Sequence, residues 1–522
     1  MLMHRPLVTA ARTEFHPMRA FFRSALVLAG IAIAACSPEH TPPPQPNIVL
    51  ITIDALRADY LSYAGHPHHT SPTLDALARD NVVFTHAVTS FPGTTASMPS
   101  LMTGLFPNFE GIEEWKKSTH HGFNDFESPG ESERQGISSN LRMLAEILRD
   151  HGYTTLGFHT NPNVSIANNF NQGFDEYQEF IGYLKRQRET RSHHFIGSYP
   201  PANVVIRRVL TRLDAGLDRP VFLWIHLMEP HSPYLPPDHL ARKFPRSYTR
   251  LSDLEVNETL YHLLYTQQGN LGAAQRYPSP KDRGIDRETL IDHVRGLYEG
   301  EIRFCDRQLN RLFKALQEHS LWDNSLVMVT ADHGEEFLDH GFVTHHLISG
   351  LKEELIRIPL ILKLPSGKTA GKKIDALVRM VDFAPTILDY VGLKEETAGM
   401  DGVSLRKMIE GLDSPALTAY YSTINFGLVR ESRWKYRLFK QPGKGSEPKE
   451  ELFDIIADPM EQTNLSADRP DVLLRMRGEF QSHVEHLLGR ATPVEGGTTL
   501  SADEIDPETA ERLEALGYVT ND

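Results

Sequence analysis

The chain has 522 residues, of which 40% are hydrophobic and 23% charged, and its formal net charge is −14 at pH 7. This composition is typical of a globular protein with one large domain and a smaller one. The negative charge argues against binding to nucleic acid, which requires a surplus of Lys and Arg. The two cysteines, Cys36 and Cys305, are too few for a disulfide framework or a zinc site built from cysteines.

The first 35 residues have the pattern of an export signal. Arg19 and Arg23 precede an apolar run that is too short for a comfortable transmembrane helix and ends in small residues. Ile33 to Cys36 resembles a bacterial lipobox, in which the cysteine is acylated and becomes the new N-terminus. We expect residues 1–35 to be removed and Cys36 to carry a lipid that anchors the protein to a membrane of the cell envelope, facing the periplasm or in the outer membrane. A cleaved signal followed by an incidental cysteine is the alternative.

Residues 36–45 are polar and rich in proline, which predicts an extended tether between the lipid and the first domain.

Short apolar runs then alternate with long helical patterns. The apolar runs cover residues 47–53, 221–226, 325–331 and 358–363, and the longest helical pattern covers 286–318. This alternation predicts an α/β fold, doubly wound around a mostly parallel central sheet. On the long helix, Cys305 shares an apolar face with Tyr298 and Ile302, which predicts a buried thiol.

Two segments lack this periodicity, and the pattern changes near the C-terminus. Residues 108–138 and 236–285 are polar and contain Gly or Pro, so we expect loops over the sheet. Beyond about residue 425, short strands and turns precede a helix near 468–488, which predicts a small α+β subdomain over 425–492. Residues 493–522 form a polar tail.

Charged side chains end two of the predicted strands. Asp54 follows the first apolar run, and Asp332 and His333 follow the run at 325–331. Each carboxylate alone could cap a helix or shape a turn. Because the carboxyl ends of parallel strands meet at one edge of a sheet, the two carboxylates and the imidazole together predict a site for one divalent cation. Such a cation lowers the pKa of a coordinated hydroxyl.

Several motifs in order carry a family resemblance. They include residues 47–59, 70–75, the Ser/Thr-rich loop 90–107, HLMEPHSPY at 226–234, Asp-His-Gly-Glu at 332–335, residues 382–386 and residues 451–454. Over roughly residues 46–490 the chain resembles the sulfatase-like branch of the alkaline phosphatase superfamily. The resemblance implies a catalytic domain over 46–424 and an ester hydrolase activity.

Roles for individual residues follow from this resemblance. It implies that Asp54, Asp332 and His333 hold the metal and that Thr94 is the covalent nucleophile. It also implies that His231 contacts the transferred group. For the group that protonates or orients the leaving oxygen, it gives two candidates, His345 and His346. Four further positions are candidate substrate contacts: His159, Asn161, His226 and His340.

The chain departs from the sulfatase pattern at three positions. Thr94 stands where sulfatases carry the Cys or Ser that matures to formylglycine, and threonine cannot be matured in this way. Ala55 replaces a second aspartate and His333 replaces an asparagine of the calcium-binding sulfatases. Both changes favour Zn or Mn over Ca or Mg.

The leading hypothesis is therefore a metal-dependent hydrolase of sulfate or phosphate esters that uses a threonine nucleophile. Its substrate could be a small molecule, a glycan or a lipid. A phospho-group or head-group transferase of the cell envelope is one alternative, and a non-catalytic binding lipoprotein on the same scaffold is another. The choice between sulfate and phosphate, and the oligomeric state, stay open.

Overall fold

The structure is a computed structural model. It describes residues 45–107, 134–135, 137–180, 199–244, 247, 249–345, 350–365, 367, 369, 371–423, 426–440, 448–490 and 499–500. The predicted signal, Cys36, His346 and nearly all of the predicted tether and tail lie outside these residues. Within the described part of the chain, no helix is long and apolar enough to cross a membrane.

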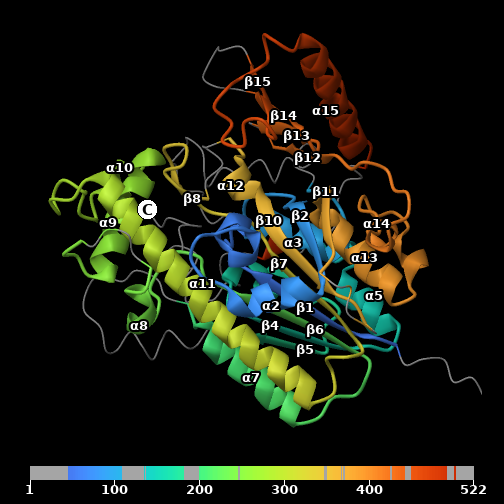
Figure 1. The fold of residues 1–522 in the computed structure, drawn as a ribbon. Coiled ribbons are helices and arrows are strands. Elements are labelled where there is room, and N and C mark those ends of the chain that lie inside the picture. The colour runs from blue at the N-terminus through green and yellow to red at the C-terminus, as the bar shows by residue number, and fades with distance from the viewer. Residues whose placement is uncertain are drawn as a thin grey trace, which may run out of the picture. The chain divides into compact units, whose positions relative to one another are not determined.

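The centre of the fold is an eight-stranded sheet (Figure 1). In spatial order its strands are β11 (Lys373–Arg379), β2 (Val82–Val88), β10 (Arg357–Lys363), β7 (Ser325–Ala331), β1 (Asn47–Ile53), β6 (Val221–Leu227), β4 (Thr154–His159) and β5 (Glu176–Glu179). All neighbouring pairs are parallel except those of β10, which runs antiparallel to β2 and β7. The mostly parallel sheet confirms the predicted fold class.

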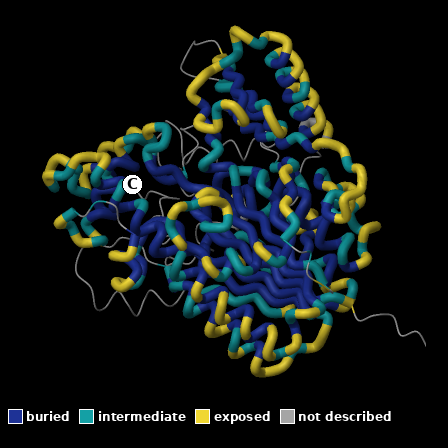
Figure 2. Tube along the Cα trace, in the orientation of Figure 1, coloured by how far each residue is buried: buried dark blue, intermediate teal, exposed yellow. Residues whose placement is uncertain are grey.

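Helices surround this sheet as in a doubly wound fold. One group comprises α2 (Pro72–Asp80), α7 (Ala202–Asp214) and α11 (Arg287–Glu318), with α2 and α7 both packed on α11. Another comprises α3 (Thr94–Thr103), α5 (Leu144–Asp150), α13 (Phe383–Tyr390) and α14 (Arg406–Glu410). The strands β1, β6 and β7 are buried along their whole length (Figure 2), as expected for parallel strands covered on both faces. Cys305 is buried on α11, as predicted.

The segment after β6 is more ordered than expected. Residues 236–285 contain three helices: α8 (Asp238–Ala241), α9 (Asp253–Gln267) and α10 (Leu271–Ala274). The prediction of loops here was wrong for α9, which is buried around much of its circumference, with Asn257, Glu258 and Thr259 enclosed beside its apolar residues. A helix enclosed in this way shows no regular apolar stripe in its sequence.

The C-terminal part adds a second, antiparallel sheet. It consists of β12 (Ala419–Ser422), β13 (Phe426–Arg430), β14 (Trp434–Phe439) and β15 (Lys449–Asp454), followed by α15 (Pro470–Arg490). This sheet begins at Ala419, slightly before the predicted boundary at residue 425. Tyr421 and Leu428 belong to a hydrophobic cluster that also contains Val88 and Leu355 of the main domain. The subdomain therefore packs on the main sheet through shared apolar side chains.

Short elements complete the described chain. They are η1 (Ala58–Tyr60), η2 (Ser62–Ala64), β3 (Arg134–Gln135), η4 (Pro162–Val164), η5 (Ile166–Asn168), β8 (Glu336–Phe337), β9 (Val343–Thr344), α12 (Glu353–Ile356), η7 (Met380–Asp382), η8 (Lys394–Thr397) and β16 (Thr499–Leu500).

Candidate active site

The carboxyl ends of three central strands bring the predicted acidic residues together. Ile53 at the end of β1 pairs with Leu227 of β6 and with Ala331 of β7, so the residues that follow these strands lie at the same edge of the sheet. Asp54 and Asp332 are the first residues beyond β1 and β7, and both side chains are fully buried. Asp332 Oδ1 accepts hydrogen bonds from the backbone N of His333, at 2.8 Å, and of Ala55, at 3.1 Å. These bonds fix the Asp332 carboxylate and direct Oδ2 toward the other residues of the site.

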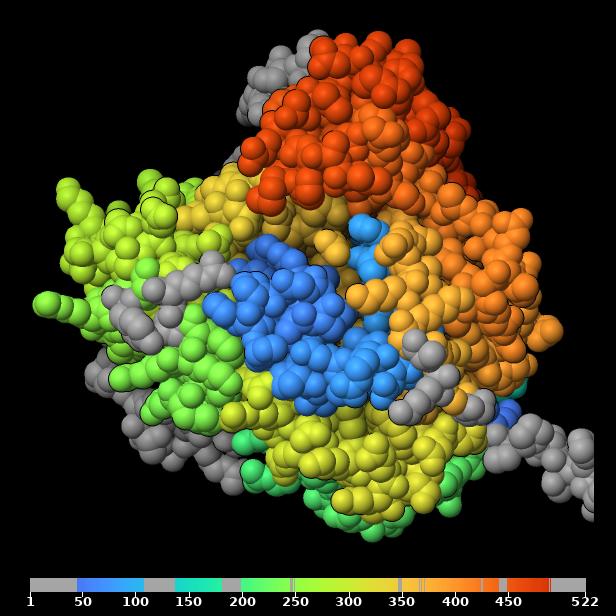
Figure 3. Space-filling view, viewed as in Figure 1, coloured from blue at the N-terminus to red at the C-terminus, as the bar shows by residue number. Residues whose placement is uncertain are grey.

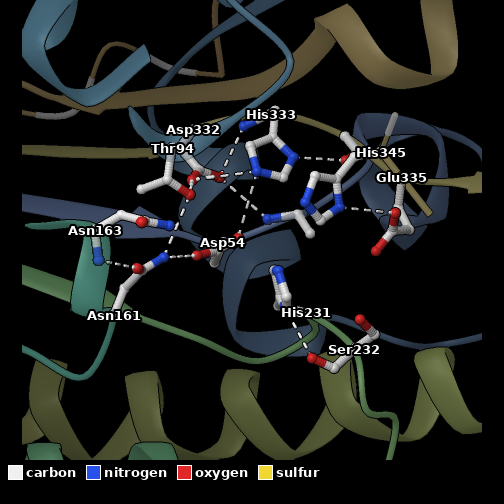
Figure 4. A network of polar contacts seen from close by, with 12 residues as sticks. Asp54, Thr94, Asn161, Asn163, His231, Ser232, Asp332, His333, Glu335 and His345 are labelled. Atoms are coloured by element: carbon white, nitrogen blue, oxygen red, sulfur yellow. Dashed lines mark hydrogen bonds and ion pairs between the residues drawn. The ribbon is translucent and has the colours of Figure 1, made fainter. Parts of the chain in front are cut away.

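Thr94 meets this carboxylate from the start of a helix. It is the first residue of α3, it is fully buried, and its Oγ1 donates a 2.8 Å hydrogen bond to Asp332 Oδ2. Asn161 Nδ2 lies 3.3 Å from the same Oγ1 and donates a 2.5 Å hydrogen bond to Asp54 Oδ2 (Figure 4). The N-terminus of a helix favours negative charge nearby, so the position of Thr94 suits a hydroxyl that becomes an oxyanion.

His333 Nε2 lies close to one carboxylate oxygen of each of the two acidic residues predicted to hold the metal. His333 Nε2 lies 3.6 Å from Asp54 Oδ1 and 3.5 Å from Asp332 Oδ2. Asp54 Oδ1 and His333 Nε2 are buried and have no hydrogen-bond partner. Metal–ligand bonds of 2.0–2.2 Å in a tetrahedral site separate neighbouring ligand atoms by about 3.3–3.6 Å. The donor set and its spacing therefore fit one divalent cation.

His226 supports Asp54 from β6. Its Nε2 lies 3.3 Å from Asp54 Oδ2, and Asp54, His226 and Asp332 also form a group with metal-binding geometry. Thr52 Oγ1 accepts a hydrogen bond from Trp224 Nε1 and lies 2.8 Å from His226 Nδ1. Because this hydroxyl has one hydrogen to donate, and His226 is its shortest acceptor, Nδ1 accepts and Nε2 carries the hydrogen that faces Asp54. This geometry favours a role for His226 in orienting Asp54 over a role as a ligand.

Burial and neighbouring charges shift the pKa values of the site residues in opposite directions. Burial raises the pKa of Asp54, but the charges of His231 and His333 and a hydrogen bond from His226 outweigh it and hold this pKa well below its usual range. Burial and the nearby Asp54 charge raise the pKa of Asp332. Burial lowers the pKa of His333, but the two carboxylates outweigh it and raise this pKa above its usual value. Two adjacent buried carboxylates need positive charge for compensation, which a divalent cation supplies.

Two further histidines approach from the side of Glu335 (Figure 4). The ring of His345 lies 4.4 Å from that of His333 and 5.0 Å from that of His231. His345 Nδ1 is 3.2 Å from Glu335 Oε1, and Tyr234 donates a 2.8 Å hydrogen bond to Glu335 Oε2. Since His231 Nδ1 is 2.6 Å from the backbone O of Ser232, its hydrogen lies on Nδ1. His231 and His345 are thus held beside the predicted metal ligands by separate contacts.

Two other residues, His159 and His340, were also predicted to contact the substrate. His159 is buried on β4, its Nδ1 lies 3.0 Å from the backbone O of Asn161, and its Nε2 lies 3.5 Å from Glu179. Burial is the main cause of its lowered pKa. His159 therefore steadies the backbone that presents Asn161. His340 lies between β8 and β9 and pairs with Glu354 at 3.3 Å, so its contact with substrate stays a prediction.

Sequence reasoning missed the supporting role of Glu335 and Thr52. Glu335 lies within the Asp-His-Gly-Glu motif, and it is fully buried. A glutamate two residues after a predicted metal ligand was the available signal for it. Thr52 gave no comparable signal, because a threonine inside a β-strand is ordinary.

Comparison with protein families assigns the chain to the sulfatase-like ester hydrolases of the alkaline phosphatase-like class. Residues 46–393 match the sulfatase family model, and residues 339–485 match the model of the C-terminal region of N-sulphoglucosamine sulphohydrolase. The chain belongs to the sulfatase family.

Individual relatives agree with this assignment. An arylsulfatase from Clostridium perfringens is 25% identical over 81% of this chain and 90% of its own length. The phosphonate monoester hydrolase of Agrobacterium radiobacter superposes with a TM-score of 0.63 at 22% identity, covering 85% of this chain and 96% of its own. A protein solved with its substrate D-glucosamine-2-N,6-O-disulfate gives a TM-score of 0.62 at 19% identity, covering 86% of this chain and 99% of its own. At these identities the two structures support the fold.

Proposed function

We propose that the chain is a metal-dependent hydrolase of sulfate or phosphate esters with Thr94 as its nucleophile. One observation carries the proposal: the buried Thr94 hydroxyl is hydrogen-bonded to Asp332, whose carboxylate also faces the point where Asp54 Oδ1 and His333 Nε2 converge. Nucleophile and cation would thus share one carboxylate, which is the arrangement that activates a weak nucleophile.

Asp54, Asp332 and His333 would hold the cation, with Zn or Mn favoured by the two oxygens and one nitrogen. When bound, the cation stabilises negative charge on the attacking and transferred oxygens. The Thr94 proton leaves along the hydrogen bond to Asp332 as Oγ1 forms a bond to sulfur or phosphorus. The bond between that atom and the ester oxygen breaks, and the ester oxygen takes a proton from His345 and leaves as an alcohol. Water then attacks the same sulfur or phosphorus and gives a proton to His345, the bond to Oγ1 breaks, and Oγ1 takes its proton back from Asp332 as the sulfate or phosphate product leaves.

Other side chains bind and orient the substrate. Asn161 Nδ2, already 3.3 Å from Thr94 Oγ1, is placed to donate to an oxygen of the transferred group. His231 faces the same group from the opposite side of Asp54 (Figure 4). These contacts suit any tetrahedral anion, so we propose the substrate class by its reacting group, and we include sulfated glycans because one structural neighbour was solved with a sulfated sugar.

A substrate panel tests this proposal. Purified protein is assayed with an aryl sulfate, a sulfated glucosamine, a phosphate monoester, a phosphate diester and a phosphonate monoester, with and without added Zn²⁺ or Mn²⁺. We expect metal-dependent turnover of at least one ester and none in Thr94→Ala. Turnover that persists in Thr94→Ala would refute the nucleophile, and activity unaffected by chelation would refute the metal dependence.

We also propose that the enzyme is exported and anchored to the cell envelope through a lipid on Cys36. The support is the apolar run that ends in small residues before Cys36, followed by the proline-rich segment 36–45.

A further inference from the structure

We propose that His66, His68 and Glu299 form a second metal site that binds Zn²⁺ and clips the segment after β1 to α11. In the described part of the chain, these residues form a group that could hold a metal ion, in which one ligand atom from each lies within 4.8 Å of the others. None of them belongs to the candidate active site.

The two imidazoles follow a turn of the chain at Gly65. Gly65 follows η2 with a φ of 105°, a left-handed conformation that glycine adopts without strain. His66 and His68 then flank Pro67 and both reach Glu299 on α11. Phe244 stacks on His68 and Tyr60 stacks on His66, with ring centroids 5.9 and 4.8 Å apart. Figure 3 shows blue residues from the first part of the described chain at the visible surface, beside green segments.

The distances fit tetrahedral coordination on the buried side. His66 Nε2 lies 3.2 Å from Glu299 Oε1, close to the separation of about 3.3 Å between two ligands of a tetrahedral zinc ion. His68 Nδ1 lies 2.5 Å from Glu299 Oε2, which is too short for two ligands of the same ion. The His68 side chain is 33% exposed, so it has room to swing outward when a cation enters. The exposed side also leaves a position for water as the fourth ligand.

Burial of the other two side chains argues for a ligand rather than a surface ion pair. Glu299 is 1% exposed and His66 is 7% exposed. His66 Nε2 is buried, faces Glu299 and has no hydrogen-bond partner of acceptable geometry. Glu299 Oε2 is hydrogen-bonded to His68, but a buried imidazole nitrogen without a hydrogen bond, such as His66 Nε2, is costly unless a cation or a proton satisfies it. Two imidazoles and one carboxylate are zinc ligands.

The site adjoins a contact that shapes the active-site turn. Tyr298, the residue before Glu299, donates a 2.6 Å hydrogen bond to the backbone O of Ala55 and accepts one of 2.9 Å from the backbone N of Arg57. Ala55 follows Asp54 and has a φ of 52°. A zinc ion at Glu299 would therefore stabilise the segment from Asp54 to His68 against α11 without contacting the substrate.

Metal analysis of the full chain tests the site. The protein is stripped with a chelator, dialysed against Zn²⁺ and measured for bound zinc and for the rise in Tm on zinc addition. We expect His68→Ala and Glu299→Gln each to lose about one zinc equivalent per chain relative to wild type. His69→Ala, which removes the neighbouring exposed histidine, should match wild type. Asp332→Ala should lose a different equivalent, so the combination with His68→Ala should lose both.

Equal zinc content in wild type, His68→Ala and Glu299→Gln would overturn the proposal and leave a carboxylate shared by two imidazoles. Loss of zinc in His69→Ala would also overturn it. Because His68 is partly exposed, we expect its alanine variant to fold, and an unchanged Tm of the zinc-free protein checks this. His68→Ala and His69→Ala are also measured in the Asp332→Ala background. A rise in Tm on zinc addition that is smaller with His68→Ala than with His69→Ala supports the second metal site independently of any activity.

Discussion

The Thr94 hydroxyl donates a 2.8 Å hydrogen bond to Asp332, although the two residues come from different parts of the chain, the start of α3 and the end of β7. This bond joins the proposed nucleophile to a proposed metal ligand. It holds the Thr94 oxygen at the carboxyl edge of the sheet. The first two predictions test the proposed nucleophile and the proposed metal site.

The first prediction separates the hydroxyl from the shape of Thr94. Thr94→Val keeps the volume but removes the hydroxyl, so we expect kcat/KM to fall by at least about 10³-fold. Thr94→Ser keeps the hydroxyl and should retain most of the activity. Steady-state kinetics and bound-metal analysis of both variants check this. A valine variant with metal bound and near-normal activity would contradict the role of Thr94.

The second prediction concerns the cation. Asp54→Asn weakens one ligand while leaving an amide that can still contact Asn161, so we expect bound metal and activity to be lost together. In wild type, chelation should abolish activity and Zn²⁺ or Mn²⁺ should restore it. Glu229→Gln is a control, because this buried carboxylate accepts a hydrogen bond from the backbone N of Ala202 and lies outside the ligand group. An Asp54→Asn protein that keeps both metal and turnover would argue against this ligand.

The third prediction distinguishes His345 from His346. If His345 protonates the leaving oxygen, His345→Ala should lose about 10²-fold or more with an alkyl ester but little with a nitrophenyl ester, whose oxygen leaves without help. His346→Ala should show no such dependence on the leaving group. Kinetics with a series of leaving groups measures the difference. The reverse pattern would transfer the role to His346.

The fourth prediction concerns stability and pH. Burial raises the pKa of Asp306 from its usual value of 3.8 to about 6, although hydrogen bonds from the backbone N of Leu74 and Thr73 oppose the shift. Because the folded-state pKa is raised, this carboxyl contributes stability that is present below pH 4 and is lost as the pH rises through about 6. The loss amounts to at most about 3 kcal/mol at 1.36 kcal/mol per pKa unit.

Asp306→Asn removes the titrating group and keeps an oxygen that accepts from Thr73. Because wild type loses stability as the pH rises and the variant does not, we expect the free energy of unfolding of Asp306→Asn minus that of wild type to increase from pH 4.5 to pH 7.5. Denaturant unfolding of both proteins across this range provides the measurement. A difference between them that does not vary with pH would show that Asp306 keeps an ordinary pKa.

The fifth prediction concerns the anchor. Cells that express the full chain should incorporate labelled palmitate into it, and the protein should sediment with membranes. Cys36→Ala should remain unlabelled. Labelling that persists in this variant, or membrane association of an unlabelled wild type, would contradict lipidation at Cys36.

The sequence predicted the strands best and the segments between them least. β1 and β7 are buried apolar runs followed directly by Asp54 and Asp332, so both the type of these strands and the edge carrying the two carboxylates could be read from the pattern. α9 could not be recognised from an apolar stripe, because polar residues such as Asn257 are buried within it. Its capping box, in which Ser252 pairs with Glu255, was the signal that marks its start.

How much of the site could be predicted from the sequence was limited by contacts between residues that are distant along the chain. The motifs indicated Thr94, Asp54, Asp332 and His333, and the structure brings these four together. Which ring nitrogen of His226 carries the hydrogen is set by Thr52. The two residues are neighbours through the pairing of β1 with β6. Spacing along the chain carries no information on such a contact.

The reversed direction of β10 in the middle of the sheet has a consequence for how this enzyme can diversify. Since β10 runs antiparallel to β7, the chain leaves β7 and enters β10 at the same edge, and the connection between them never has to cross to the far side. This one connection carries His333, Glu335 and His345, so it holds a proposed metal ligand, a buried supporting carboxylate and a proposed proton donor together. Changes in its length or composition could retune the substrates accepted while every strand of the sheet keeps its neighbours.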